Sequence, residues 1–147
     1  MAHCPNCEVE LEEDVPNAKF HFINSNHGSN EDGEEYERRD HFIYLDDQLV
    51  LEYKPGGKSC EPYRQYNTQG NGIYGPTPRS LSAWLSFNNW CPGDIIPIRT
   101  IELGDLEAGE HSFKIEVPDA VFADGQGYFP MSVYLQGYTT TLGAEDF

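Results

Sequence analysis

The chain has 147 residues, enough for one domain with its own core, and its 25 acidic and 9 basic residues give a formal net charge of −16. This charge argues against a nucleic-acid partner, because phosphates would be repelled, and no apolar run approaches the roughly 18 residues that a membrane span needs. With 38% hydrophobic and 13% aromatic residues, the composition is that of a folded domain.

Residues 1–17 form an acidic N-terminal segment with a Cys-x-x-Cys motif and room for a first strand, and residues 18–147 are expected to form a single domain. Short runs in which apolar and polar residues alternate predict strands. Helical spacing is also available between Leu81 and Asn88, but the alternation with serine favours a strand. The predicted strands are Ala18–Ile23, His41–Leu45, Gln48–Tyr53, Leu81–Asn88, Ile98–Leu103, Ser112–Val117 and Met131–Gly137.

Strands at this spacing, joined by connections rich in glycine and proline, predict an all-β antiparallel jelly-roll sandwich of about eight strands. Asp46-Asp47 lies between two apolar runs and predicts a tight hairpin turn. Residues 54–79 form a long irregular loop, and loops of this length in compact domains are usually functional or disordered. Its three tyrosines, Tyr63, Tyr66 and Tyr74, favour packing over disorder.

The four cysteines leave several interpretations open. Cys4 and Cys7 have the spacing of half a zinc site, which needs a second close pair, and a redox Cys-x-x-Cys needs a strand-to-helix context that the pattern lacks. Cys60 and Cys91 are either a disulfide that ties the long loop to the core or two buried thiols. A disulfide indicates a secreted or periplasmic chain, and two thiols an intracellular protein or a virion component.

The second half of the chain, with one stretch near residue 27, carries a distinctive set of motifs. Together these motifs resemble the C-terminal jelly-roll domain of peptide-N-glycosidase F-like proteins, a family related in fold to the copper monooxygenases. The resemblance runs over roughly residues 18–137. The motifs are Asn89-Trp90-Cys91-Pro92-Gly93, Pro97-x-Arg99-Thr100, Leu103-Gly104-x-Leu106-x-Ala108-Gly109-x-His111, Gly127-Tyr128-Phe129-Pro130-Met131, Asn26-His27-Gly28, which resembles the family's Gly-His-Gly, and Glu35-Tyr36.

The resemblance implies an activity on N-linked glycans. Enzymes of the family hydrolyse the amide that joins the glycan to asparagine, at a site between two jelly-roll domains. Glu35 matches a supporting catalytic glutamate, and Trp90 matches a tryptophan that lines the glycan cleft. The further candidate contacts to a glycan or a partner are Tyr36, His27 and Arg99, and the resemblance also pairs Cys60 with Cys91 in a disulfide.

The sequence departs from the family pattern at several places. The principal catalytic aspartate belongs to a first domain that is not in this chain. Gly33 and Glu37 stand where cysteines flank the family's glutamate, and Phe87 stands where the family has an arginine. Glu34 and Glu37 place like charge beside Glu35, and the acidic run from residue 31 to residue 37 is interpreted as a solvated surface.

These departures favour a module that is non-catalytic on its own and serves glycan or protein binding, or assembly within a larger complex. The alternative is half of a peptide-N4-(N-acetyl-β-glucosaminyl)asparagine amidase with Glu35 as its supporting carboxylate. No cofactor is expected. Weaker alternatives are a metal on Cys4 and Cys7, a copper pair at His27–His111 or His21–His41, and calcium on Asp32, Glu34 and Glu35, none of which has the usual ligand spacing.

Overall fold

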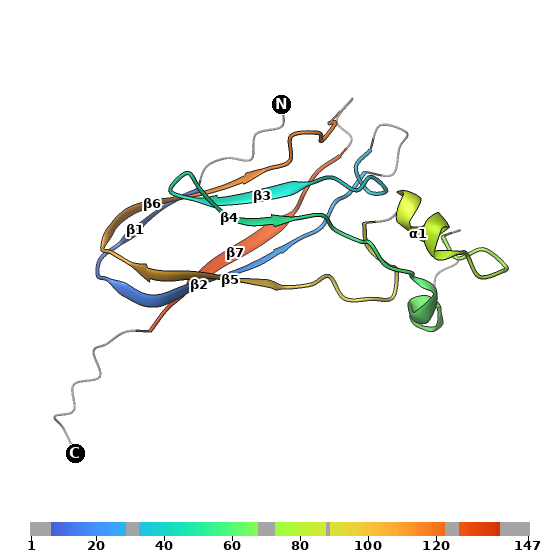
Figure 1. Cartoon of the computed structure of the whole chain (residues 1–147), viewed down its shortest axis with the longest axis horizontal. Coiled ribbons are helices and arrows are strands. Elements are labelled where there is room, and N and C mark those ends of the chain that lie inside the picture. Colours follow the sequence, from blue (N-terminus) through green and yellow to red (C-terminus); the bar gives the residue numbers. More distant parts are fainter. Residues whose placement is uncertain (1–6, 29–32, 68–72, 88, 123–126, 139–147) are drawn as a thin grey trace, which may run out of the picture.

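Two antiparallel sheets pack face to face in the computed structural model, which describes residues 7–28, 33–67, 73–87, 89–122 and 127–138 (Figure 1). The predicted all-β sandwich is therefore confirmed, with seven strands in the described part where about eight were expected. One sheet has the order β1 (Cys7–Leu11), β6 (Gly109–Glu116), β3 (His41–Leu45), β4 (Gln48–Tyr53), and the other has the order β5 (Arg99–Leu106), β2 (Val15–Asn24), β7 (Met131–Gln136).

The alternating side chains of the strands form the main core between the sheets. Phe113 and Ile115 of β6 are almost completely buried, as their period-two spacing predicts. They face Phe20 and Phe22 of β2, and the rings of Phe20 and Phe113 meet edge to face at 5.3 Å. Burial of these apolar side chains, each contributing on the order of 2 kcal/mol, holds the two sheets together.

The turn predicted at Asp46-Asp47 joins β3 to β4. Both residues have positive φ, 49° and 62°, as a two-residue type I′ turn requires. The Asp46 carboxylate accepts hydrogen bonds from the backbone N–H of Ser112 at 2.8 Å and from His111 Nδ1 at 2.7 Å. Against the effect of burial, the hydrogen bonds from Ser112 and then from His111 lower the pKa of Asp46. The hydrogen bonds of the imidazole with the carbonyl oxygen of Glu107 and then with Asp46 raise the pKa of His111. These contacts offset the cost of the left-handed backbone and fasten the turn to β6.

The strand predicted over Leu81–Asn88 is wrong, because Leu81–Phe87 forms helix α1. Ser80 stabilises its first turn by accepting the Ala83 N–H at 3.2 Å on its hydroxyl oxygen, the usual role of a serine at this position. The indole of Trp84 is completely buried on the inner face of the helix. Burial of Trp84 thus outweighs the local alternation with serine, whereas Leu81 is 54% exposed.

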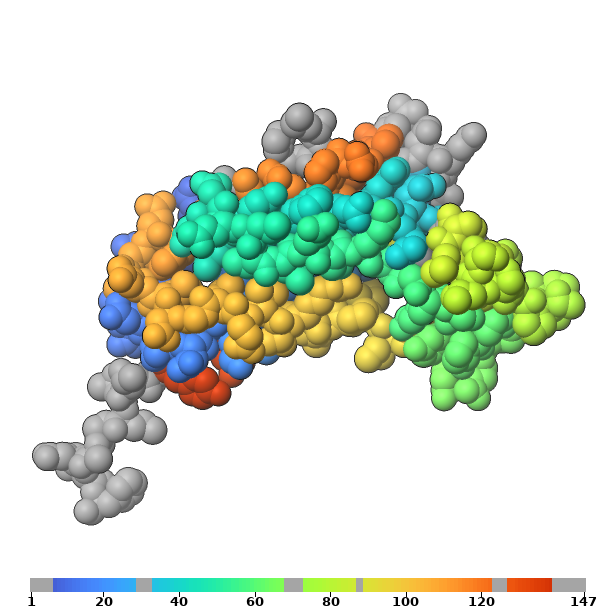
Figure 2. All heavy atoms as spheres, viewed as in Figure 1, coloured from blue at the N-terminus to red at the C-terminus, as the bar shows by residue number. Residues whose placement is uncertain are grey.

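A second, smaller core lies at one end of the sandwich, in the segment from residue 54 to residue 94 that we call the end lobe. It contains Ile73, Trp84 and the disulfide between Cys60 and Cys91, whose Cα atoms are 5.1 Å apart. The long loop also forms a short 3-10 helix, η1 (Glu61–Tyr66). Figure 2 shows the end lobe projecting beyond the sheets. In the described part of the chain, no helix is long and apolar enough to cross a bilayer.

His41, at the start of β3, is a completely buried imidazole. Its ring stacks on Tyr53 at 4.8 Å and lies 5.6 Å from the ring of Phe129, and its Nδ1 forms a hydrogen bond with the carbonyl oxygen of Arg39. Burial removes water from the charged form and lowers the pKa of His41 to about 4. The folded protein therefore holds this histidine neutral.

We expect the free energy of unfolding to fall as the pH drops from about 6.5 to about 4, because the unfolded histidine then takes up a proton that the folded one refuses. A pKa of about 4 in place of 6.5 corresponds to a loss on the order of 3 kcal/mol at the acid end. Urea unfolding across this range should show a shallower pH dependence for His41→Phe. His21→Phe, on an exposed sheet face, should keep the wild-type dependence, and equal dependences for both variants would contradict the prediction.

Candidate functional site

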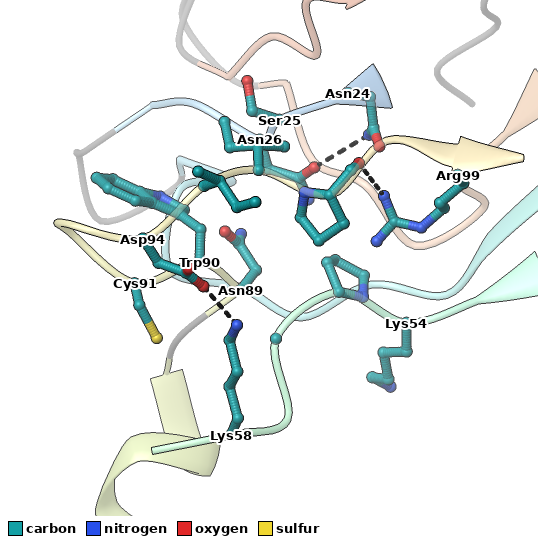
Figure 3. A pocket seen from close by; sticks show the side chains of 15 residues that line it. Asn24, Ser25, Asn26, Lys54, Lys58, Asn89, Trp90, Cys91, Asp94 and Arg99 are labelled. Atoms are coloured by element: carbon teal, nitrogen blue, oxygen red, sulfur yellow. Dashed lines mark hydrogen bonds and ion pairs between the residues drawn. The ribbon is translucent and has the colours of Figure 1, made fainter. Parts of the chain in front are cut away.

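A pocket lies where the end lobe meets the sandwich (Figure 3). Its volume is about 170 Å³, which is below the roughly 300–1,000 Å³ of pockets that hold drug-sized ligands. The walls are the end of β2, the segment after β4, the turn around Trp90 and the residues that lead into β5. The polar and aromatic side chains that line it are Asn24, Ser25, Asn26, Lys54, Lys58, Asn89, Trp90, Asp94 and Arg99.

The turn that carries Trp90 is held from several sides. Cys91 is tied to Cys60, and the Tyr74 hydroxyl donates to the carbonyl oxygen of Pro92 at 2.6 Å. Gly93 has a φ of +91°, and a Cβ there would lie 2.7 Å from the carbonyl oxygen of Tyr63, so only glycine fits this position. The motif Trp-Cys-Pro-Gly is therefore the sequence of a fixed turn that holds Trp90 at the pocket wall.

Asn89 connects this turn to the loop that carries Glu35. Its side-chain amide is buried and donates to the carbonyl oxygens of Glu34, at 3.0 Å, and Glu37, at 3.1 Å. Since Asn89 precedes Trp90 and Glu34 precedes Glu35, these hydrogen bonds place both candidate residues at the same end of the sandwich.

The side chain of Glu34 is completely buried and braces the same loop from inside. Arg39 donates to both carboxylate oxygens, from Nε at 3.0 Å and Nη2 at 3.1 Å, and the backbone N–H of Val121 donates at 2.7 Å. The hydrogen bond to Glu34 raises the pKa of Arg39. Glu34 is thus not part of a solvated acidic surface, which corrects that interpretation of the run from residue 31 to residue 37.

Glycines allow this loop to pack closely against the chain near residue 127. Gly28 has a φ of +121°, and a Cβ there would lie 2.7 Å from the backbone nitrogen of Gly127. The carbonyl oxygen of Gly28 accepts the Glu35 N–H at 3.1 Å. His27 precedes this contact, stacks on the ring of Tyr128 at 5.2 Å and makes a 2.7 Å hydrogen bond with the hydroxyl of Ser25. His27 therefore packs beside the loop and is held there by Tyr128 and Ser25.

The predicted site residues fall into two neighbouring groups. Trp90 and Arg99 line the pocket, whereas Glu35, Tyr36 and His27 do not. Glu35 is half-buried and forms a hydrogen bond with Tyr36, whose pKa is raised by burial and then by the charge and hydrogen bond of Glu35. The structure thus gives two adjacent surfaces, a pocket with an aromatic wall and a braced carboxylate loop.

Sequence reasoning missed Asn24, Asn26 and Asn89, and the pair of Glu34 with Arg39. Asn26 carried a signal, because it stands where the resemblance puts a glycine. The structure buries this side chain, which is 2% exposed. The contact of Glu34 with Val121 carried none, since the two residues are 87 positions apart in the sequence.

In the described part of the chain, no group of three or more potential ligands is placed to hold a metal ion. Cys4 and Asp32 lie outside the described residues, and the thiol of Cys7 is exposed and free. His41 lies in the core, whereas His21 lies on the other sheet with its Nε2 2.7 Å from Gln136. His111 is engaged with Asp46.

The sequence matches the family described as "Peptide-N-glycosidase F, C terminal" over residues 2–136. The chain belongs to this family. The match begins well before residue 18, where the resemblance in the motifs starts, and therefore includes β1. A search among curated proteins gives no match to the chain.

Solved structures of this glycosidase family share the fold. Two crystal forms of PNGF-II are 30% and 33% identical to the chain with a TM-score of 0.72, and the match covers 90% of this chain and 24% of theirs. Recombinant PNGase F and PNGase F from Flavobacterium meningosepticum, a glycosylasparaginase, are 17% identical with TM-scores of 0.60 and 0.61. The match covers 92% of this chain and 44% of theirs, so the chain spans less than half the length of each.

Removing the charge of Glu34 should destabilise this family member strongly. Glu34→Gln leaves Arg39 without its carboxylate in a largely buried setting, and breaking a buried pair costs about 3 kcal/mol. Urea unfolding at neutral pH measures the loss. In the matched control Glu102→Gln, the glutamate removed from the pair with Lys19 is 68% exposed, where Glu34 is 0% exposed, and the change should be below about 1 kcal/mol. Similar losses in the free energy of unfolding for both variants would show that the buried Glu34–Arg39 pair matters no more than a surface pair.

Proposed function

We propose that this peptide-N-glycosidase F-type chain is a glycan-recognising module that is non-catalytic on its own and works within a larger assembly. Trp90 at the pocket wall carries the proposal. Its half-buried indole is fixed by the Cys60–Cys91 disulfide and by the turn at Gly93. Rigid aromatic faces beside fixed amide groups suit sugar rings, which are apolar on one face and polar at their edges.

One further observation supports the assembly part of the proposal. The side chains of Ile95 and Ile98, which follow the Trp90 turn, are 82% and 65% exposed. Exposed aliphatic side chains beside a pocket are typical of surfaces that a partner covers.

We also propose a secreted or periplasmic location, because disulfides such as Cys60–Cys91 form in oxidising compartments.

The binding role is tested with a short glycopeptide that carries N,N′-diacetylchitobiose on asparagine. Isothermal titration should give saturable binding to the chain, and Trp90→Ala should weaken it about tenfold or more, because sugar stacking is lost. Tyr134→Ala, which removes an exposed aromatic ring from the outer face of β7, should bind as the wild type does. Equal affinities for the two variants would refute the assignment to Trp90.

The alternative, half of a peptide-N4-(N-acetyl-β-glucosaminyl)asparagine amidase, is supported by one observation. The loop of Glu35 lacks the two flanking cysteines that the resemblance implies, yet Asn89 and the Glu34–Arg39 pair brace it. A fixed carboxylate beside a tyrosine is suited to orienting a water molecule. The principal aspartate would have to come from a partner domain.

Glycan release from the same glycopeptide tests this alternative. The chain alone should release none, whereas the chain mixed with the first domain of PNGase F should release glycan if Glu35 has the supporting role. Glu35→Gln should then reduce the rate at least about tenfold, and Glu52→Gln, an exposed change on β4, should not. No release from any mixture would eliminate the amidase alternative.

A further inference from the structure

A chain of polar contacts ends in the pocket. The Tyr53 hydroxyl donates to Asn24 Oδ1, which leaves the Asn24 amide nitrogen as a donor. That nitrogen lies 3.5 Å from Asn26 Oδ1, at the outer limit of a hydrogen bond. The Tyr53 hydroxyl thus orients the amide of Asn24, and the Asn24 nitrogen lies on the oxygen side of the Asn26 amide.

The last group in this series of polar contacts, the amide nitrogen of Asn26, is a hydrogen-bond donor. Asn26 lines the pocket and is only 2% exposed. Its Nδ2 is buried and has no acceptor among the described residues. Trp90 Nε1, also at the pocket, has no acceptor in the described part of the chain either. A buried donor without an acceptor costs about 1–3 kcal/mol, so an acceptor supplied from outside would be favourable at both positions.

Arg99 adds a charged donor across the pocket from Trp90 (Figure 3). Its guanidinium lies 3.9 Å from the ring centroid of Tyr53, and its contact with the carbonyl oxygen of Pro97 is long, at 3.4 Å. Within the described ranges, Arg99 has no carboxylate in ion-pair distance. Burial lowers the pKa of Arg99, which means that its charge has lost water and has gained no anion in exchange.

The charges around the pocket oppose the charge of the whole chain. Its lining contains Lys54, Lys58 and Arg99 but a single acid, Asp94, which is paired with Lys58. Lys54 is paired with Asp40, outside the lining. In a chain of net charge −16, this is a local surplus of positive charge, and Arg99 is the cation that remains available to a ligand.

We propose that this pocket binds an oxyanion substituent, a sulfate or a carboxylate, of an acidic saccharide. An oxyanion brings acceptors only, which suits the unpaired donors of Asn26 and Trp90, and its charge suits Arg99, which has no carboxylate partner among the described residues. A neutral sugar hydroxyl can also accept from these donors, but it brings no negative charge to pair with the guanidinium of Arg99. The volume of about 170 Å³ suits one sugar ring or substituent. The inference rests on the proposed function and narrows its ligand class.

The test is isothermal titration of the full chain with four probes: N-acetylglucosamine, N-acetylglucosamine 6-sulfate, glucuronic acid and inorganic sulfate. We expect at least one acidic sugar to bind about tenfold more tightly than neutral N-acetylglucosamine, as one hydrogen bond to a charged group allows. The two acidic probes distinguish sulfate from carboxylate recognition. Inorganic sulfate binding as tightly as the acidic sugars would overturn the saccharide part of the proposal.

Three variants complete the experiment. Asn26→Gly, which restores the family's residue, and Arg99→Gln should each reduce the preference for the acidic sugar about tenfold. Lys114→Gln removes the same charge from β6, away from the pocket, and should leave the preference unchanged. Thermal unfolding checks that each variant is folded, and Asn26→Gly tests the pocket even if Arg99→Gln does not fold. Equal effects of Arg99→Gln and Lys114→Gln would overturn the inference.

The outcomes separate this inference from the proposed function. Equal binding of neutral and acidic sugars overturns the inference and leaves glycan recognition intact. Binding of acidic sugars alone supports the inference and contradicts recognition of the neutral chitobiose core. Binding of neither kind contradicts both.

Discussion

The arrangement of the loops at one end of the sandwich depends on a single buried carboxylate. Glu34 has no access to water, and an unpaired carboxylate in such a place would cost several kcal/mol. It is satisfied by Arg39 and by the backbone of Val121. These donors reach it from two different parts of the chain, so the loop, the start of β3 and the segment after β6 are held in one arrangement. The buried pair is better understood as a source of specificity than of net stability.

The end lobe is stabilised by other interactions than the loops around Glu34. It has too few apolar side chains for a large core, and its backbone is irregular over most of its length. The Cys60–Cys91 disulfide, the buried indole of Trp84 and the hydroxyl of Tyr74 substitute for sheet hydrogen bonding. The result is a rigid turn at Trp90, and a rigid aromatic side chain loses little conformational entropy when a ligand binds.

The sandwich could be predicted from sequence because apolar and polar residues alternate along the predicted strands. The alternation in Ser112–Val117 and the two aspartates after Leu45 are local signals, and both were confirmed. The strand prediction that begins at Leu81 was wrong because the same residues fit both strand alternation and helical spacing. Burial of Trp84 in the end lobe decided in favour of the helix. The pocket could not be predicted, since Asn26, Trp90 and Arg99 meet only through tertiary structure. The family resemblance located Trp90 and Arg99 but treated Asn26 as a mere replacement for glycine.

The pocket lies on the boundary between two core clusters that, in the described part of the chain, have no residue in common. Asn24, Asn26 and Arg99 belong to the sandwich, whereas Trp90, Cys91 and Lys58 belong to the end lobe. A molecule bound there would touch both units at once and act as a non-covalent crosslink between them. Its binding energy would be added to the work needed to pull the end lobe away from the sheets.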